Sequence, residues 1–562
     1  MSAALAFAEP KYVRTPSAWL NPMGQHGSIS SPHYLASQAG LSTLRKGGNA
    51  IDAAIAAAST LSVVYPHMAA LGGDNFWLIY NTNTGELRGL NASGRAGQKA
   101  TIAFYAKKDF RRIPPRGYYA ANTVPGCVSG WGEAYQYSKD VLRTKLLWKD
   151  LFADAIRYAE TGFPVSASLA RWLRINTNTA NQELNNLQQF PGFRQTFLRS
   201  DGSPYDVGET LRQPHLFSTL QTLAEQGPQE FYLGEIARKI VVDLEAHDGM
   251  LSLSDFARHQ ADWVRPISAP YRDGISFNLP PNSQGIASLS ILNILNQFDP
   301  AEFPEGSAPY YRLIIEATKE AFYDRDRYLT DPAFQSVPVE EILSCEHGRA
   351  QAARIRSGGV DTLPDPKPLD PNGDTIWLGV VDQAGNAVSL IQSIYHDFGS
   401  GIIPPKTGVL LQNRGCFFSL ESEHVNRLEP GKRTFHTLSA AMFFKRGKPF
   451  LIYGTMGGEG QPQTQAAIVT RIIDHQLSPQ DAIEGPRWLY GRTWGTVTNN
   501  VKLESRIPQG VADALRRWQH SVEIVEPYAH IMGHAGAILI DQETQIQYSA
   551  SDPRSDGLAA SY

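Results

Sequence analysis

The composition of the chain changes abruptly at residue 375, and this change constrains the possible fold more than any other feature of the sequence. Residues from about 355 to 374 are rich in Pro, Gly and Asp and lack apolar periodicity, which predicts an exposed, mobile loop. Residues 375–395 then read TIWLGVVDQAGNAVSLIQSIY, with an apolar run on either side of a turn at 382–386. This pattern predicts a buried β-hairpin that begins at Thr375.

Thr375 stands where a threonine can become a nucleophile. A threonine hydroxyl needs an adjacent base, and the α-amino group of an N-terminal threonine, with a pKa near ~7.7, supplies one. Within a longer chain this requires cleavage of the peptide bond between Asp374 and Thr375. A polar loop followed at once by a buried strand suits such a cleavage, because the strand fixes the new terminus. A threonine at the start of a strand is common, so this layout alone does not decide.

The rest of the pattern predicts sheets covered by helices on both faces, without a regular βαβ alternation. Gly47-Gly48 is placed to end the first helix, and Asn49 is placed to cap the second, Ala-rich one. Helices are expected at 34–46, at 50–61 and through most of 146–330. Strands are expected at 76–80, 86–90, 440–454 and 533–541.

Composition and charge argue against several classes of protein. With 51 basic and 55 acidic side chains, the chain has no field that attracts nucleic acid or an anionic membrane. No stretch approaches the roughly 18 apolar residues of a membrane helix. The 14 histidines and three cysteines show no metal-ligand spacing, so neither a metal nor another cofactor is expected. Sparse cysteines and an N-terminus without a basic region before its apolar stretch predict a cytoplasmic location.

A series of motifs, in order along the chain, carries a family resemblance. The motifs are GGNAIDAA at 47–54, GG at 72–73, VPG at 124–126, the hairpin at 375–388, FGSG at 398–401, PGKR at 430–433 and GTMGG at 454–458. By these motifs the chain, from about residue 30 to 550, is identified as a member of the gamma-glutamyltransferase family. That family belongs to the N-terminal-nucleophile hydrolase superfamily.

The resemblance implies an α+β fold, a four-layer αββα sandwich with two stacked sheets between helical layers. It also implies self-cleavage into a large fragment, residues 1–374, and a small fragment, residues 375–562, which stay associated as one domain. Thr375 is then the nucleophile and, through its α-amino group, the base. Gly457 and Gly458 would offer backbone N–H groups to an oxyanion hole, and the Ser393 hydroxyl would support Thr375.

The segment that would bind the substrate departs from the family. Known members hold the α-amino group of a glutamyl substrate on an acidic motif, but Cys416 and Phe417 replace its acids here, and Arg414 is gained. A buried ammonium without an anionic partner is costly, whereas a guanidinium offers a fork to a carboxylate. We therefore expect an acyl group with a carboxylate and no ammonium, as in glutaryl amides or oxamate. The subtype resembles acylases and oxamate amidohydrolases.

Further residues are predicted to bind the substrate beside Arg414. Ser93 falls at the position of the family's carboxylate-binding arginine, but Arg95 lies two residues away and has the reach to replace it. His436 replaces one of two family serines, and Tyr395 lies near a family asparagine. The complete predicted set is Arg95, Arg414, Asn413, Tyr395 and His436.

Three functions are compatible with the sequence. The first is a self-processing amidohydrolase for a small carboxylate-bearing acyl group, with hydrolysis favoured over transfer because no acceptor site is evident. The second is a gamma-glutamyltransferase or glutathione hydrolase in which other residues supply the lost anion. The third is a binding protein that kept the fold and lost catalysis, although retention of Thr375, Ser393 and the glycine pair argues against it. The expected partners are a small amide substrate and the two fragments for each other, with oligomerisation left open.

Overall fold

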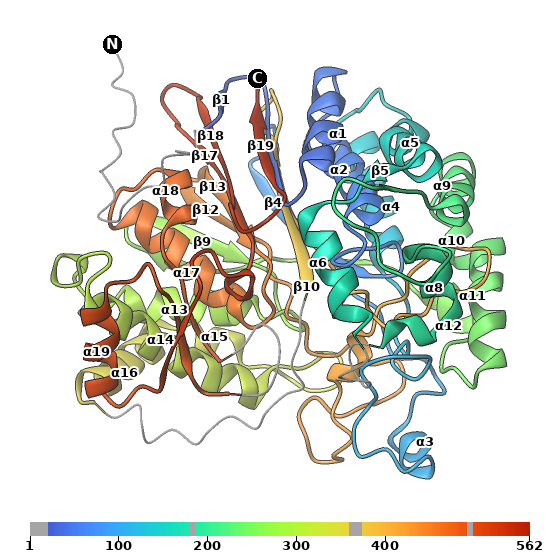
Figure 1. The fold of residues 1–562 in the computed structure, drawn as a ribbon. Coiled ribbons are helices and arrows are strands. Elements are labelled where there is room, and N and C mark those ends of the chain that lie inside the picture. Colours follow the sequence, from blue (N-terminus) through green and yellow to red (C-terminus); the bar gives the residue numbers. More distant parts are fainter. Residues whose placement is uncertain (1–20, 179–185, 359–373, 492–497) are drawn as a thin grey trace.

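Two seven-stranded sheets lie face to face, and helices cover both outer faces (Figure 1). The computed structural model describes residues 21–178, 186–358, 374–491 and 498–562. Within these ranges the helices α1, α2, α4–α6 and α8–α12 lie on one side of the sheets and α13–α19 on the other (Figure 1). The predicted α+β architecture of four layers is confirmed.

The first sheet contains Thr375, the predicted nucleophile, and for that reason we call it the nucleophile sheet. Its order is β19-β2-β10-β11-β3-β4-β7, and every neighbouring pair is antiparallel. Both predicted hairpins form, as β3–β4 and β10–β11. The strands are β2 (Ser28–Ser31), β3 (Asp74–Asn81), β4 (Glu86–Ala92), β7 (Asp262–Val264), β10 (Asp374–Val381), β11 (Ala387–Tyr395) and β19 (Leu558–Ser561).

The second sheet, the opposite sheet, has the order β1-β18-β17-β13-β12-β9-β8. Its strands are β1 (Met23–Gly24), β8 (Ile267–Tyr271), β9 (Gly274–Asn278), β12 (Ala441–Lys445), β13 (Lys448–Thr455), β17 (Ala535–Ile540) and β18 (Gln547–Ser551). Strands from before and after residue 374 occur in both sheets, so the two predicted fragments interleave. The expectation of helix through most of 146–330 is confirmed by α5, α6 and α8–α14, although the short strands β7, β8 and β9 also lie in this range. Two of these short strands lie at sheet edges, and β8 contains Pro270, so their pattern is weak.

The first two helices follow the sequence closely. Helix α1 (Tyr34–Arg45) is followed by Gly47 with a φ of +86°, and Asn49 caps α2 (Ala50–Val64) in a capping box with Asp52. Every residue of α2 is buried, because the helix packs on β10 and β11 and is covered by α1, α4 and α5. This all-round burial explains its run of alanines.

The remaining helices complete the two outer layers. On the side of the nucleophile sheet they are α4 (Cys127–Asp140), α5 (Ala153–Thr161), α6 (Ala167–Asn176), α8 (Pro191–Phe197), α9 (Pro214–Gln226), α10 (Glu230–Leu233), α11 (Glu235–Ala246) and α12 (Leu253–Arg258). Helix α3 (Ile102–Lys107) lies apart from this layer, at the bottom of the view in Figure 1. On the other side they are α13 (Gly285–Leu295), α14 (Ala308–Tyr328), α15 (Val339–Ile342), α16 (Cys345–Arg356), α17 (Gly460–Ile473), α18 (Pro479–Glu484) and α19 (Gln509–Arg517). Smaller sheets pair β5 (Phe163–Pro164) with β6 (Thr210–Leu211), and β15 (Val501–Glu504) with β14 (Trp488–Tyr490) and β16 (Val522–Val525).

The two sheets interlock through Trp377. Its side chain joins the apolar cluster between the sheets, whereas Ile376 and Leu378 join the cluster under the helices. A Cβ atom on Gly454 of β13 would lie 2.2 Å from Trp377, and one on Gly536 of β17 would lie 2.4 Å from it. The indole therefore occupies space that only glycine leaves open.

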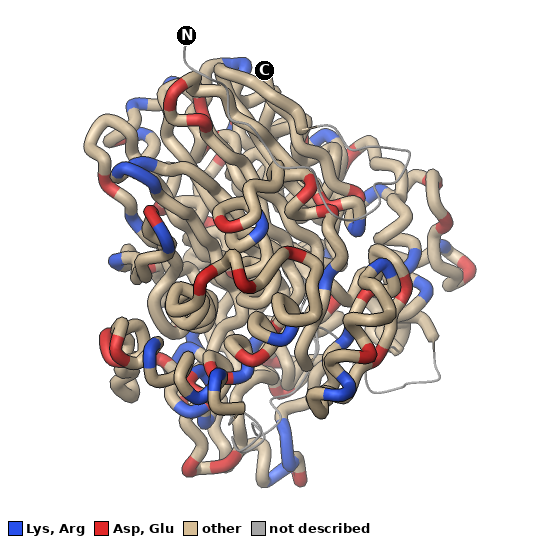
Figure 2. The backbone as a smooth tube through the Cα atoms, turned by 90° about the vertical axis from the view of Figure 1, so that its left-hand side faces the viewer, with Lys and Arg blue, Asp and Glu red and all other residues tan. Residues whose placement is uncertain are grey.

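Part of the predicted loop before Thr375 has a defined structure. Residues 355 and 356 form the end of α16, and residues 359–373 lie outside the described residues. No helix in the described part of the chain is long and apolar enough to cross a membrane. Basic and acidic residues are interspersed in the view of Figure 2, and neither sign gathers on one side of it.

Candidate active site

Thr375 lies at an irregularity of the β10–β11 ladder. Asp374 pairs with Tyr395 and Ile376 pairs with Gln392, so Ser393 and Ile394 together oppose the single residue Thr375. This arrangement is a β-bulge, a device that re-aims side chains and is frequent beside active sites. The Thr375 hydroxyl is completely buried and has no hydrogen-bond partner among the described residues. A buried hydroxyl without a partner is costly and needs a functional explanation.

The predicted oxyanion turn lies at the end of the sandwich where Thr375 lies. Thr375 is two residues from Trp377, so both side chains face the opposite sheet. Across the gap, Gly379 lies against Ile452 and Trp377 lies against Gly454. Continuing this progression by two residues brings the end of β13 and Met456, which directly precedes the Gly457-Gly458 turn, toward the end of the sandwich that contains Thr375.

Gly457 and Gly458 connect a strand to a helix. They follow β13 and precede α17, and their φ angles of +128° and +52° are ones that other residues rarely adopt. The Gly460 N–H donates to the Gly457 carbonyl at 2.7 Å, which closes the turn. The N-terminus of a helix favours negative charge, so this location suits the stabilisation of an oxyanion.

Ser393 connects the nucleophile strand to a buried carboxylate. Its hydroxyl accepts a hydrogen bond from the Tyr395 N–H at 2.8 Å. On its other side, β11 pairs with β3, and Ser393 is the register partner of Asp74. The residue predicted to support Thr375 is therefore part of the bulge and lies next to Asp74 on the neighbouring strand.

Asp74 is fully buried and saturated with donors. Its Oδ1 accepts from the Gly94 N–H at 3.0 Å, the Gly126 N–H at 3.1 Å and Gln412 Nε2 at 2.9 Å. Its Oδ2 lies 3.2 Å from His436 Nε2. Burial raises the pKa of Asp74 to about 6, although these donors and the nearby Arg414 charge oppose the rise.

His436 is held as one neutral tautomer. Its Nδ1 accepts a hydrogen bond from the Leu438 N–H at 3.3 Å, so the ring proton lies on Nε2 and is donated to Asp74. Burial, reinforced by Arg414 and Arg433, lowers the pKa of His436 well below its ordinary value. His436 therefore contributes a fixed dipole to the site and no charge.

Arg414 is a buried cation without an ion-pair partner among the described residues. Its side chain lies in the short 3-10 turn Arg414–Phe417 and is 1% exposed. Nη2 donates to Thr437 Oγ1 at 3.1 Å, whereas Nε and Nη1 have no hydrogen-bond partner in the described part of the chain. Burial lowers the pKa of Arg414 to about 10, so the guanidinium stays charged near neutral pH. Such a group is a ready site for a carboxylate.

Tyr395 covers one face of that guanidinium. The Arg414 Cζ lies 3.8 Å from the centre of the Tyr395 ring, a close cation–π contact. Tyr395 is in the same apolar cluster as Cys416 and Phe417, the two residues that replace the acids of the family motif. The wall beside Arg414 is therefore apolar where the family is acidic.

Arg95 and Asn413 are engaged in other contacts. Arg95 is partly exposed and forms an ion pair with Asp262 at 3.0 Å, and Arg433 shares that carboxylate at 2.5 Å. Asn413 donates to the Pro115 carbonyl at 2.6 Å and accepts from the His396 N–H at 3.0 Å. The structure thus brings together Arg414, Tyr395 and His436 from the predicted substrate-binding set, and it turns Arg95 and Asn413 to other partners. The positions of Arg95 and Asn413 in the sequence did not reveal which way their side chains point.

Two residues of the cluster escaped the sequence reasoning. Asp74 follows the Gly72-Gly73 motif directly, and an acid at the buried start of an apolar strand was a usable signal. Thr437 was not among the predicted site residues, yet its hydroxyl accepts a hydrogen bond from Arg414. Among the described residues, no group of three or more His, Cys, Asp or Glu side chains is arranged to hold a metal ion.

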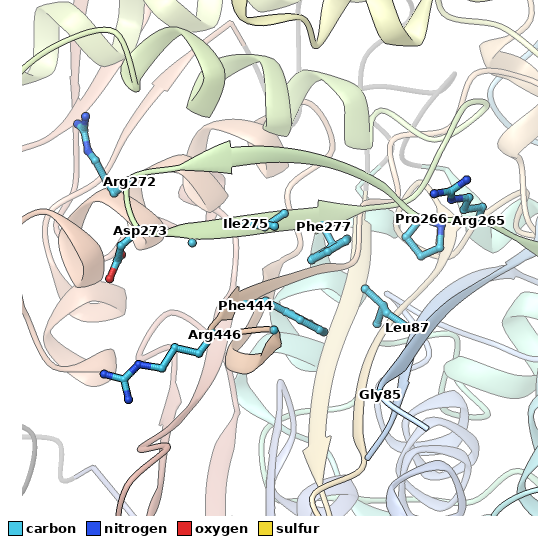
Figure 3. A pocket seen from close by; sticks show the side chains of 12 residues that line it. Gly85, Leu87, Arg265, Pro266, Arg272, Asp273, Ile275, Phe277, Phe444 and Arg446 are labelled. Atoms are coloured by element: carbon cyan, nitrogen blue, oxygen red, sulfur yellow. The ribbon is translucent and has the colours of Figure 1, made fainter. Parts of the chain in front are cut away.

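A pocket of about 620 Å³ lies elsewhere (Figure 3). Phe277 and Phe444 of the opposite sheet and Leu87 of β4 line it, with Gly85 at its edge (Figure 3). The turn before β4 lies beside the turn at 382–386, because the Thr82 N–H donates to Asn386 Oδ1 at 3.0 Å. This pocket is therefore at the other end of β10 from Thr375, and no predicted site residue lines it.

The chain is similar to known proteins along almost its whole length. The model of a family described as Gamma-glutamyltranspeptidase matches residues 36–562. The chain is 44% identical over 538 residues to the glutathione hydrolase-like YwrD proenzyme of Bacillus subtilis (strain 168), covering 96% of this chain and 98% of that protein. It is 43% identical over 537 residues to the oxamate amidohydrolase proenzyme of Klebsiella pneumoniae subsp. pneumoniae, with coverage of 96% and 98%. The crystal structure of cephalosporin acylase from Bacillus halodurans matches with a TM-score of 0.87 at 35% identity, over 99% of both chains.

Proposed function

Since the chain belongs to the gamma-glutamyltranspeptidase family and is an amidohydrolase of the N-terminal-nucleophile type, we propose that Thr375 is its nucleophile. We further propose that its substrate is an amide of a small acyl group that carries a carboxylate. The observation that carries the substrate assignment is the buried Arg414 guanidinium, which has two nitrogens without a partner among the described residues.

The first reaction is cleavage of the chain itself. The Thr375 hydroxyl attacks the carbonyl carbon of Asp374, the peptide nitrogen leaves as the new α-amino group, and the acyl group is transferred to Oγ1 as an ester. Water then hydrolyses this ester, which releases the Asp374 carboxylate and restores the hydroxyl. The bulge and the unpartnered hydroxyl of Thr375 support this step.

Turnover uses the terminus that cleavage creates. The α-amino group of Thr375 takes the hydroxyl proton while Oγ1 attacks the substrate carbonyl, and the developing negative charge is received by the N–H groups of the Gly457-Gly458 turn. The amine product leaves with a proton from the ammonium, and water hydrolyses the acyl-enzyme ester. Removing one such oxyanion donor typically costs about 2.7–4 kcal/mol in activation free energy.

The acyl group follows from the charges beside Thr375. Arg414 attracts a carboxylate, and the neutral His436 and the apolar Cys416 and Phe417 offer nothing that binds an ammonium. Two relatives support this direction by name, since one is an oxamate amidohydrolase and another a cephalosporin acylase. A glutaryl- or oxamate-like acyl group is therefore the proposed substrate class, with hydrolysis as the reaction.

Glutathione hydrolysis is the competing assignment, because one relative is named glutathione hydrolase-like. A gamma-glutamyl substrate brings an ammonium, and Asp74 is the carboxylate in the Arg414 cluster that is available to meet it. Asp74 already accepts from three donors on Oδ1 and from His436 on Oδ2, and it is completely buried. The nearby Arg414 would also repel an ammonium, which argues against this substrate.

Intact mass under denaturing conditions tests the nucleophile. Wild-type protein should give two chains of 374 and 188 residues, the smaller beginning at Thr375, whereas Thr375→Ala should give one chain of 61.9 kDa. A single wild-type chain would overturn the assignment. Glutaryl-, oxalyl- and gamma-glutamyl-p-nitroanilide then test the substrate class, and a clear preference for the gamma-glutamyl compound would favour the competing assignment.

A further inference from the structure

Gln284 lies where the candidate oxyanion turn meets the segment that binds Arg414. It directly precedes α13, and it is completely buried. We propose that Gln284 is a positioning residue, which fixes the Gly457-Gly458 turn against Thr437. This inference rests on the proposed function and adds to it a residue that acts through the groups that meet the substrate.

One side-chain nitrogen of Gln284 bridges two carbonyl groups. Its Nε2 donates to the Gly458 carbonyl at 2.8 Å and to the Thr437 carbonyl at 2.7 Å. The Thr437 hydroxyl in turn accepts a hydrogen bond from Arg414 Nη2 at 3.1 Å. The oxyanion turn is therefore connected to the buried guanidinium through Gln284 and Thr437 alone.

The orientation of the Gln284 amide follows from its neighbours. Carbonyl oxygens only accept hydrogen bonds and a guanidinium only donates them, so Nε2 must face the two carbonyls and Oε1 must face Arg325. Arg325 Nη1 donates to Oε1 at 3.3 Å, and Arg325 Nη2 lies 3.7 Å from Glu459, the residue directly after the turn. The Gln284 N–H donates to the His436 carbonyl at 2.8 Å. Both the backbone and the side chain of Gln284 are thus held in place.

The glycine turn depends on support of this kind. Gly457 and Gly458 have positive φ angles, and glycine restricts its own backbone very little. The Gly457 carbonyl is bound within the turn by the Gly460 N–H at 2.7 Å, whereas the Gly458 carbonyl accepts a long bond from the Gln461 N–H at 3.3 Å and the shorter bond from Gln284. The Gly458 N–H lies between these two carbonyls in the chain, so its direction depends on both. Misplacement of a catalytic group by about 1 Å can cost about 100-fold in rate.

Two substitutions separate the carbonyl contacts of Gln284 from its contact with Arg325. Gln284→Glu keeps the shape of the side chain and the contact with Arg325, but an ionised carboxylate cannot donate to either carbonyl. Gln284→Met removes all three side-chain hydrogen bonds. Both variants should lower kcat for glutaryl-p-nitroanilide by about 100-fold at saturating substrate, expressed per mole of cleaved chain. A change in KM alone, or an unchanged kcat in Gln284→Glu, overturns the inference.

Gln465 provides a matched control for loss of a buried amide. Its Nε2 donates to the Ser439 carbonyl at 2.6 Å, and its Oε1 accepts from the Ser288 hydroxyl at 2.5 Å. None of its hydrogen bonds in the described part of the chain reaches the turn or Thr437. Gln465→Met should therefore destabilise the protein to urea as Gln284→Met does, while kcat stays within about twofold of wild type. An equal fall of kcat in the two methionine variants overturns the inference, because it would reflect a general disturbance of the core.

Hydrogen exchange separates failure of this inference from failure of the proposed function, because it needs no catalysis. Amide exchange followed by mass spectrometry is compared in the uncleaved Thr375→Ala protein with and without Gln284→Glu. Peptides that contain residues 436–438 and 457–460 should both exchange about three- to tenfold faster in the double variant, as expected for the loss of one hydrogen bond to each segment. Faster exchange supports the inference even where the wild-type protein remains a single chain, which by itself would overturn the proposed function. Unchanged exchange in both peptides overturns the inference whatever the wild-type activity.

Discussion

Two buried arginines, Arg554 and Arg414, show how differently this molecule treats the same side chain. Arg554 is bound to Glu504 at 2.7 and 2.8 Å and to Asp552 at 3.0 Å. Arg414 is equally buried, but no carboxylate lies within ion-pair distance of it among the described residues. Burying an unpaired charge costs several kcal/mol, so only the first arrangement is explained by stability.

The neighbouring carboxylates reflect the same contrast. Burial opposes ionisation of Asp552, yet Arg487 and Arg554 hold its pKa down at about 2, and the pKa of Glu504 is lowered as well. Asp74, beside Arg414, has its pKa raised by burial to about 6. A buried charge with complete pairing therefore marks a structural element, whereas a buried cation with open nitrogens marks a place for a ligand anion.

The largest expected effect concerns the paired arginine. Arg554→Met removes the buried cation that bridges Glu504 and Asp552, which should lower the free energy of unfolding by about 3–5 kcal/mol. Urea unfolding followed by circular dichroism measures the change. A loss below about 1 kcal/mol would mean that this network does not stabilise the fold, and the contrast between Arg554 and Arg414 would then be wrong.

Arg414→Met should have the reverse effect of Arg554→Met, because it should reduce activity and leave stability unchanged or higher. Loss of the carboxylate's partner should reduce kcat/KM for an oxalyl or glutaryl anilide by about 2–5 kcal/mol in activation free energy, roughly 30- to 5,000-fold. The free energy of unfolding should be unchanged or higher, because a buried unpaired charge disappears.

Butyryl-p-nitroanilide, which has no carboxylate, provides the control for that variant, and its slow hydrolysis should be the same in both proteins. Arg414→Lys keeps the charge without the planar fork and should be intermediate. An equal loss of activity on the butyryl compound would show that Arg414 acts on the structure of the site and does not bind the acyl group.

The sequence predicted the local elements of the candidate site better than the surroundings of the buried Arg414. The hairpin from Thr375 to Tyr395 was predictable because two apolar runs and a Gly-Asn turn are local signals within a few residues, and the turn at Gly457-Gly458 was marked by its glycines. Arg414 was recognisable as a gain of positive charge in one segment. Its burial and its stacking on Tyr395 were not, because both depend on a fold-level contact between separate segments.

Asp74 shows most clearly what local sequence patterns could not predict. Its four donors come from residues 20, 52, 338 and 362 positions away, so no local pattern connects them. Strands β8 and β9 were missed for a related reason. Strand β8 is a short edge segment with a proline, and β9 is a short segment between β8 and β12, so both gain their stability from pairing with neighbouring strands and not from their own pattern. The prediction that Arg95 reaches the substrate relied on distance along the chain, which says nothing about direction.

Buried histidines avoid the cost of an unpaired charge by staying neutral, which makes stability depend on pH. Burial lowers the pKa of His33 to about 3, whereas the unfolded chain titrates near ~6.5. Below that value only the unfolded state takes up this proton, so stability is lost as the pH falls. At pH 5 the loss attributable to His33 should be about 2 kcal/mol.

His33→Asn isolates this contribution. His33 caps α1 by accepting from the Leu35 N–H at 3.2 Å, and asparagine is also a good cap, so the variant should be close to wild type at pH 7. Between pH 7 and pH 5 its free energy of unfolding should fall by about 2 kcal/mol less than that of wild type. Parallel falls in both proteins would mean that His33 is protonated in the folded state.

Arg95→Ala should have the smallest effect, because Arg95 belongs to neither kind of buried site. Its guanidinium is 38% exposed and pairs with Asp262, a carboxylate that is itself 43% exposed and that Arg433 also binds. Exposed ion pairs are typically worth about 0–1 kcal/mol, and Asp262 keeps one partner after the substitution. Urea unfolding should therefore change by less than about 1 kcal/mol, and kcat/KM for the oxalyl and glutaryl anilides should stay within about twofold. A tenfold fall in kcat/KM without loss of stability would show that Arg95 binds the substrate, and that Arg414 shares the carboxylate with a residue from the exposed side.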